Sequence, residues 1–144
     1  MAVYADTSFL SSYFLPDANS ARAFVSVKAL SVPLVFTALH RLELKNALGL
    51  AVFRGRITPS QNQMVWRDIT TDLASGLLSA FPTNWYAVMR QAALLSAQHT
   101  PSTGCRSLDV LHIAAALRLG STEFFSFEVR QRSMAQLVGL TVKP

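Results

Sequence analysis

The chain has 144 residues, of which 51% are hydrophobic, so it can form one domain with a sizeable core. A net charge of +5 and a sequence pI near 10.0 fit a polyanionic partner, but they fit a soluble protein that is simply basic equally well. The only cysteine is Cys105, which excludes an intrachain disulfide and a zinc site built from several thiolates.

The N-terminal third alternates short apolar runs with helical patterns. Residues 2–5 are typical of a buried strand, and the Asp-Thr-Ser that follows is helix-start chemistry. A first helix is expected over residues 9–15 and a second over about residues 19–30, where apolar residues recur at helical spacing. Residues 34–36 predict another short strand. The longest helix is expected over residues 38–54, with a glycine directly after it.

The middle of the chain continues this alternation. A Thr-Pro-Ser start predicts a helix from residue 58 to about residue 75. Residues 77–81 predict a strand, and a Pro-Thr-Asn start predicts a helix over residues 82–98. Residues 99–106 are rich in Thr, Ser, Pro and Gly, so they predict the clearest loop of the chain. A helix over residues 107–119 follows.

The C-terminal part predicts a strand over residues 123–127, a helix over residues 128–138 and a strand over residues 140–142. Strands thus alternate with helices or helix pairs, which predicts one α/β domain, residues 1–144, with a mostly parallel sheet covered on both faces. The sequence reaches its first strand without a charged leader or an apolar signal core, and its apolar runs are too short to span a membrane. We therefore expect a cytoplasmic protein.

Four carboxylates interrupt or end apolar segments of this acid-poor chain: Asp6, Glu43, Asp109 and Glu128. Burying an unpaired charge is very costly, and carboxylates that gather in a fold repel one another unless a cation lies between them. Ligands of parallel sheets bind beyond the carboxyl ends of the strands, where Asp6 and Glu128 fall. A carboxylate cluster selects a hard divalent ion, Mg²⁺ or Mn²⁺. In a basic chain this pattern indicates metal-assisted cleavage of nucleic acid.

Each position also has a structural interpretation. Asp6 could be an ordinary N-cap, and Asp109 and Glu128 could each stabilise a helix dipole by about 0.3–1 kcal/mol. Glu43, with Asn46 on the same helix face, is harder to explain in this way because its immediate neighbours are leucines. Spacing alone leaves open whether the four side chains converge.

Several other side chains have two interpretations. Arginines that could contact phosphates, or simply be solvated near helix ends, are Arg54, Arg56, Arg106, Arg130 and Arg132. His112, three residues after Asp109, could face the site or pack in the core. Trp66, Trp85 and Tyr86 are interpreted as core or interface residues rather than base-stacking platforms.

The long helix over residues 38–54 is apolar on nearly every side. Such a helix needs cover beyond one core face, and with residues 64–66 it predicts an exposed hydrophobic groove. The groove would serve homodimerisation or a partner helix. The alternative is that the rest of the chain covers it.

The resemblance to a known family rests on four ordered stretches: Tyr-Ala-Asp-Thr-Ser at 4–8, Leu-Glu-Leu-Lys-Asn-Ala at 42–47, Arg-Ser-Leu-Asp-Val-Leu-His at 106–112 and Ser-Phe-Glu at 126–128. Over essentially its whole length the chain resembles the PIN-domain ribonucleases, especially the VapC toxins of bacterial toxin–antitoxin pairs. The resemblance implies a three-layer α/β/α sandwich with a short, mostly parallel central sheet. It also implies an endoribonuclease that depends on Mg²⁺, for which Mn²⁺ can substitute.

The resemblance assigns roles as well. It places the family's acidic quartet on Asp6, Glu43, Asp109 and Glu128. Its hydroxyl position falls on Thr7 or Ser8, and Asn46 supports the site. The family usually has aspartate at the fourth position, so Glu128 moves these oxygens outward by one methylene. RNA as substrate and a VapB-type antitoxin are the implied partners, and the expected groove adds a homodimer.

In the expected mechanism, Asp6 and Asp109 hold the metal ion. The ion polarises the scissile phosphate and lowers the pKa of a bound water. Glu43 and Glu128 would orient that water or hold a second ion. One rival is a non-catalytic RNA- or protein-binding domain. A phosphatase pattern needs a second aspartate two positions after Asp6, where this chain has Ser8. A nucleotide-binding module would need a Walker or Gly-x-Gly-x-x-Gly turn, which the sequence lacks.

Overall fold

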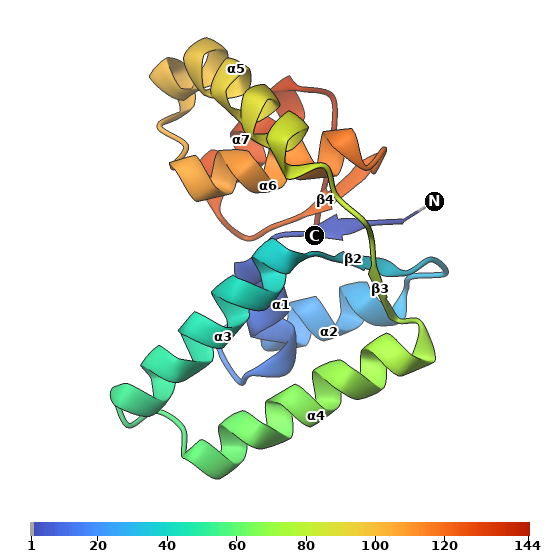
Figure 1. Ribbon diagram of the computed structural model, residues 1–144, viewed down its shortest axis with the longest axis vertical. Helices are drawn as coiled ribbons and strands as arrows, with labels where there is room; N and C mark the ends of the chain where they lie inside the picture. Colours follow the sequence, from blue (N-terminus) through green and yellow to red (C-terminus); the bar gives the residue numbers. More distant parts are fainter. Residues whose placement is uncertain (1) are drawn as a thin grey trace.

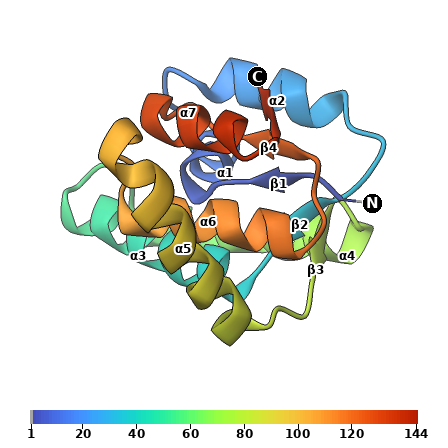
Figure 2. The same cartoon turned by 90° about the horizontal axis from the view of Figure 1, so that it is seen from above.

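The structure is a computed structural model that describes residues 2–144 (Figures 1 and 2). Its elements are, in chain order, β1 (Tyr4–Ala5), α1 (Thr7–Phe14), α2 (Ser20–Lys28), β2 (Leu34–Phe36), α3 (Ala38–Phe53), α4 (Pro59–Ser75), β3 (Leu78–Ala80), α5 (Trp85–Thr103), α6 (Ser107–Arg118), β4 (Glu123–Phe125), α7 (Val129–Leu137) and β5 (Thr141–Lys143).

All strand pairings are parallel in the described part of the chain. β1 lies next to β4, which lies next to β5, while β2 pairs with β3. A parallel bridge between Val3 and Leu34 joins the two groups, so the strands follow the order β3-β2-β1-β4-β5. The first strand is therefore central. Because the strands are parallel, their carboxyl ends meet at one edge, as the alternation of strands and helices predicts.

Helices cover both faces of this short sheet, which confirms the expected three layers (Figure 1). Tyr4, Val35 and Phe124 belong to one apolar cluster with α5, α6 and α7. Ala5 and Phe125 point to the opposite cluster, which includes residues of α1, α2, α3 and α4. Side chains alternate between faces along a strand, so strands that are apolar at every position require cover on both sides.

The prediction of a loop over residues 99–106 is wrong, because α5 continues to Thr103 and only residues 104–106 are non-helical. Pro101 lies in the last turn, where the missing N–H removes a single hydrogen bond. The hydroxyls of Ser102 and Thr103 both donate to the carbonyl of His99. These two residues suggest a loop by their type, but here they cap the end of the helix. Gly104 then ends the helix with a φ of +67°.

Other boundaries shift by a few residues. β4 ends at Phe125 rather than at residue 127, which leaves residues 126–128 as the approach to α7. β5 begins one residue later than expected. α1 begins at Thr7 because the backbone N–H of Phe9 already donates to the Asp6 side chain. No helix within residues 2–144 combines the length and apolar character that crossing a bilayer requires.

The expected groove along α3 is only partly present. Leu44 and Leu48 are buried in the core, so the chain covers one side of this helix itself. Leu42, Leu50 and Phe53 are exposed by 67%, 39% and 87%. The helix is therefore not apolar all round. It exposes these three apolar side chains, which we call the apolar crest of α3.

Candidate active site

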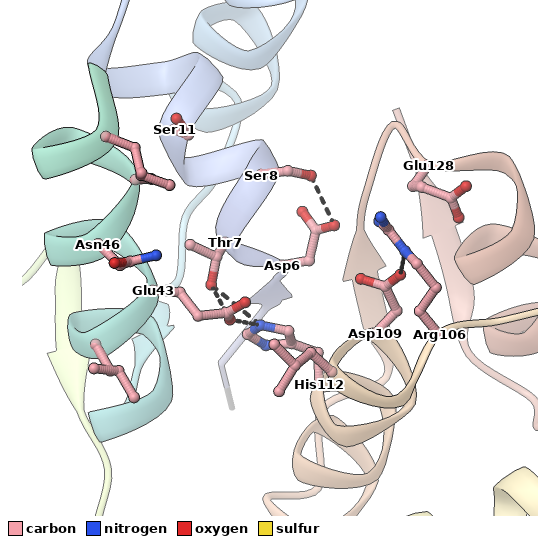
Figure 3. A pocket seen from close by; sticks show the side chains of 14 residues that line it. Asp6, Thr7, Ser8, Ser11, Glu43, Asn46, Arg106, Asp109, His112 and Glu128 are labelled. Carbon is pink, nitrogen blue, oxygen red and sulfur yellow. Dashed lines mark hydrogen bonds and ion pairs between the residues drawn. The ribbon is translucent and has the colours of Figure 1, made fainter. Parts of the chain in front are cut away.

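All four carboxylates line one pocket of about 550 Å³ at the carboxyl edge of the sheet (Figure 3). We call it the carboxylate pocket. Its lining residues are Asp6, Thr7, Ser8, Ser11, Leu42, Glu43, Asn46, Ala47, Leu50, Arg106, Leu108, Asp109, His112 and Glu128. Segments far apart in sequence thus converge, and the expected supporting residues Thr7, Ser8 and Asn46 lie with them.

Asp6 directly follows β1 and is the N-cap of α1. The Phe9 backbone N–H donates to its Oδ1 at 2.7 Å, while the hydroxyls of Ser8 and Ser126 donate to its Oδ2 at 3.0 and 3.2 Å. Only 3% of Asp6 is exposed, and this burial raises the pKa of its carboxyl despite the opposing charge of His112 and these hydrogen bonds. Within the described residues no Lys or Arg pairs with it. A nearby divalent cation would stabilise this carboxylate.

Glu43 is held from α1 and α6 at once. The Thr7 hydroxyl donates to its Oε1 at 2.8 Å, and Nε2 of His112 lies 2.5 Å from the same oxygen. Burial alone would raise the pKa of Glu43. The hydrogen bond and charge of His112 and the hydrogen bond of Thr7 outweigh it and hold this pKa below its ordinary value. Glu43 is therefore an oriented, ionised carboxylate at neutral pH.

His112 is both a core residue and a site residue, since it is 2% exposed and also lines the pocket. Its Nδ1 lies 2.8 Å from the Tyr4 hydroxyl, so β1 fixes the ring while Nε2 faces Glu43. Behind it, His40 accepts from the Thr37 backbone N–H at Nδ1, and its Nε2 lies 2.8 Å from the Ala5 carbonyl. Burial is the main cause that lowers the pKa of His40 to about 3, so this ring is neutral.

The opposite wall of the carboxylate pocket holds its carboxylates differently. Asp109, in the first turn of α6, forms an ion pair of 3.0 Å with Nε of Arg106, whose side chain is 72% exposed. The hydrogen bond and charge of Asp109, and then the charge of Glu128, raise the pKa of this guanidinium. Glu128 is the N-cap of α7 and accepts from the Gln131 backbone N–H at 2.7 Å.

A buried polar link joins the two walls. The Ser126 hydroxyl lies 3.2 Å from Asp6 Oδ2 and 2.7 Å from Oε1 of Gln131. The Gln131 side-chain amide donates to the backbone carbonyl of Asp109 at 3.1 Å. Sequence reasoning missed Ser126 and Gln131. Ser126 stood within one of the quoted stretches, whereas the spacing of Gln131 carried no signal.

The predicted arginines divide into two groups. Arg106 lines the carboxylate pocket, and Arg54 and Arg56 line an adjoining pocket of about 480 Å³, which we call the arginine pocket. The two pockets share Ser11, Ala47 and Leu50. Arg130 and Arg132 line neither of them. Arg132 instead donates to the Ser126 and Pro144 carbonyls, which is a structural role.

The donor set fits a hard divalent ion by its chemistry. Four carboxylates and three hydroxyls surround one pocket, and oxygen ligands of this kind select Mg²⁺ or Mn²⁺. Within residues 2–144, however, no group of three or more His, Cys, Asp or Glu side chains is already gathered closely enough to hold a metal ion. Asp6 and Glu43 are fixed by buried partners, while Asp109 is engaged with Arg106. To share an ion with Asp6, Asp109 has to turn away from that guanidinium.

No protein-family model matches the chain, and no curated protein matches it. Solved structures do. The crystal structure of FitAcB from Neisseria gonorrhoeae aligns with a TM-score of 0.63 and 15% identity over 100% of this chain and 97% of that one. The structure of FitAB bound to an IR36 DNA fragment aligns with a TM-score of 0.67 and 16% identity over 99% and 94% of the two chains. At this identity the likeness concerns the fold, which is PIN-like as expected.

Proposed function

We propose that this protein is an endoribonuclease that depends on Mg²⁺ or Mn²⁺ and acts in the cytoplasm as the VapC-type toxin of a toxin–antitoxin pair. The observation that carries the proposal is the convergence of Asp6, Glu43, Asp109 and Glu128 on one pocket of a PIN-like fold. A basic chain with four carboxylates in one pocket suits a phosphodiester substrate.

In this proposal Asp6 and Asp109 hold the divalent ion, with Glu128 beside Asp109. When bound, the ion would supply charge stabilisation at the phosphate and a more acidic water. Glu43 is ionised and fixed by His112 and Thr7, so it can orient the attacking water. Ser8 and Ser126 keep the Asp6 carboxylate in place, while Asn46 can donate to a phosphate oxygen from the α3 wall.

A VapB-like antitoxin and a second copy of this chain are the proposed protein partners. Leu42, Leu50 and Phe53 form the apolar crest of α3 that residues 2–144 leave uncovered, and two of them also line the carboxylate pocket. A neighbour of the same fold is described as FitAB, bound to a DNA fragment. An antitoxin seated on this crest would cover the route into the site.

The test incubates the purified protein with structured RNAs in Mg²⁺ or Mn²⁺, in chelator, and as the Asp6→Asn variant. Cleavage should require the ion and fall by about a thousandfold or more in Asp6→Asn, a loss of roughly 4 kcal/mol in transition-state stabilisation. Asparagine still caps α1 and removes a buried charge, so the melting temperature should not fall.

The matched control is Asp68→Asn, which removes an exposed carboxylate on α4 and should leave cleavage unchanged. Full cleavage by Asp6→Asn, or cleavage in chelator, would contradict the proposal.

The second candidate function is an inactive PIN-like domain that binds RNA or protein. The Arg106–Asp109 ion pair favours it, because a guanidinium already neutralises a carboxylate on that wall. This candidate predicts intact RNA in Mg²⁺ and RNA binding that survives Asp6→Asn.

A further inference from the structure

A strand cut at an internal phosphodiester leaves the carboxylate pocket in two directions, so an endoribonuclease needs contacts on both sides. On one side of the carboxylate pocket lies the arginine pocket, which is lined by Arg54 and Arg56 together with Asp17. The following inference concerns the other side of α3 and rests on the proposed function.

Two further pockets lead away from the carboxylate pocket across α3. The bridging pocket shares Leu42 with the carboxylate pocket and is also lined by Arg41 and Lys45. The tryptophan pocket shares Lys45 with the bridging pocket and reaches α4 at Trp66 and Arg67. Figure 1 shows α3 and α4 side by side in the lower half of the molecule, as their contacts require. The three pockets are therefore neighbours, with the Leu42 side chain between the first two and the Lys45 side chain between the last two.

This path is basic and contains an aromatic face. Arg41, Lys45 and Arg67 are exposed, and none of the ion pairs in residues 2–144 involves them. The Lys45 ammonium lies 4.1 Å from the Trp66 ring centroid, and the Arg41 guanidinium lies 6.0 Å from the same centroid. No carboxylate lines either the bridging pocket or the tryptophan pocket. A polyanion with aromatic bases complements this combination of charge and ring.

We propose that Arg41, Lys45, Trp66 and Arg67 form a contact site for single-stranded RNA that flanks the scissile bond. A base stacks on Trp66 in place of the Lys45 ammonium, and Lys45 turns to the neighbouring phosphate. The exchange is favourable because stacking of a base on an aromatic ring is stronger than an exposed cation–π contact. Asn62 and Gln63 line the same pocket, so their side-chain amides are available to hydrogen-bond to base edges. The contact is sequence-tolerant, since every base has a face to stack.

The chain contains a matched comparison for this site. On α2 the Lys28 ammonium lies 5.2 Å from the ring centroid of Phe24, which is half exposed. The pocket beside Phe24, however, is lined by Asp68 and Asp72. The same lysine-over-ring arrangement therefore occurs in an acidic setting, where RNA binding is disfavoured.

The experiment measures binding of a short unstructured RNA oligonucleotide in chelator, so that no cleavage occurs. Trp66 and Trp85 are the only tryptophans, so a Trp85→Phe background reports on Trp66 alone. RNA should quench its fluorescence. Trp66→Ala should weaken binding about tenfold and Trp66→Phe less, because a smaller ring remains for stacking. Lys45→Glu should weaken binding by about threefold or more and reduce the salt dependence by about one phosphate contact.

The controls Phe24→Ala and Lys28→Glu should change RNA affinity less than twofold. Lys45→Glu changes an exposed side chain, so the inference stays testable even if Trp66→Ala folds poorly. Two results together would overturn the contact site, whatever the cleavage assay shows. RNA would have to leave the Trp66 fluorescence of the Trp85→Phe protein unchanged, and both Lys45→Glu and Trp66→Phe would have to bind RNA with wild-type affinity. Conversely, Trp66-dependent binding without cleavage in Mg²⁺ would contradict the nuclease and leave the contact site standing.

Discussion

The two walls of the carboxylate pocket hold their acids in opposite ways (Figure 3). On the wall formed by α1 and α3, Asp6 and Glu43 accept hydrogen bonds from hydroxyls, a backbone N–H and a buried histidine. On the wall formed by α6 and α7, Asp109 is paired with the exposed Arg106, and Glu128 caps a helix. We call these the fixed wall and the open wall.

This difference indicates a division of labour. Within residues 2–144 no Lys or Arg pairs with either carboxylate of the fixed wall, so hydrogen bonds orient these two groups towards the pocket without a permanent cation beside them. On the open wall the exposed Arg106 guanidinium cancels the charge of Asp109, and a stronger cation could replace it. The proposed divalent ion, if bound, would take the place of Arg106 at Asp109 while the fixed wall stays as it is.

The largest effect should come from removing His112, the α6 residue that orients Glu43 on the fixed wall. In His112→Ala, Glu43 loses the partner that orients it, so kcat should fall by about 10- to 100-fold while KM changes little. The Tyr4 hydroxyl loses its contact with His112 as well, which should lower the free energy of unfolding by about 1–3 kcal/mol.

Two variants refine this test through steady-state kinetics per folded molecule. His112→Gln can still donate to Glu43 and should recover part of the lost kcat. His99→Ala removes a histidine outside the pocket and should leave kcat unchanged. A rise in KM alone in His112→Ala would show that the residue binds substrate rather than positions Glu43.

A smaller effect should follow from the neutral His40 behind the fixed wall. Its pKa is about 3 in the folded chain against an ordinary value of 6.5, so the unfolded chain takes up the proton first as the pH falls. The contribution of His40 to the free energy of unfolding is therefore fully present above pH 6.5, and it is lost as the pH falls from 6.5 towards 3. Between pH 7.5 and pH 5 the loss should be about 2 kcal/mol.

Denaturant titrations of the wild type and His40→Gln measure this loss. Glutamine at this position keeps the capping box with Thr37 but does not titrate. The variant should be less stable at pH 7.5, and its stability should depend less on pH. Asp6, whose pKa is raised, acts in the opposite direction in both proteins and cancels in the comparison. Parallel pH profiles would show that His40 is not the responsible group.

The smallest effect is expected from the open wall. Arg106→Ala should change the free energy of unfolding by less than about 1 kcal/mol, because the ion pair is largely exposed. Freed from its guanidinium, Asp109 should bind Mn²⁺ a few times more tightly, as titration calorimetry would measure. Arg118→Ala, at the far end of the same helix, is the matched control. Weaker Mn²⁺ binding in Arg106→Ala would reverse the role assigned to this arginine.

The sequence predicted the layers well because they depend on local patterns. Apolar strands between amphipathic helices require a parallel sheet with two covered faces, and Asp6 marked the end of the central strand. The prediction of a loop over residues 99–106 was wrong because the hydroxyls of Ser102 and Thr103 donate to a helix carbonyl. Their residue types alone do not reveal this contact.

The site was predictable only in part. The four carboxylates stood out because each interrupts an apolar segment, and they do line one pocket. Their partners did not stand out. The contact of Tyr4 with His112 spans 108 positions, and that of Ser126 with Asp6 spans 120, so only the fold brings them together. The difference between the two walls follows from such contacts.

The most direct test of the shared ion is a crystal structure of the protein soaked in Mn²⁺, with an anomalous difference map. The account predicts a peak in the carboxylate pocket that contacts both Asp6 and Asp109, with Arg106 displaced. A pocket without a peak at saturating Mn²⁺, or a peak held by one wall with the Arg106–Asp109 pair intact, would contradict it.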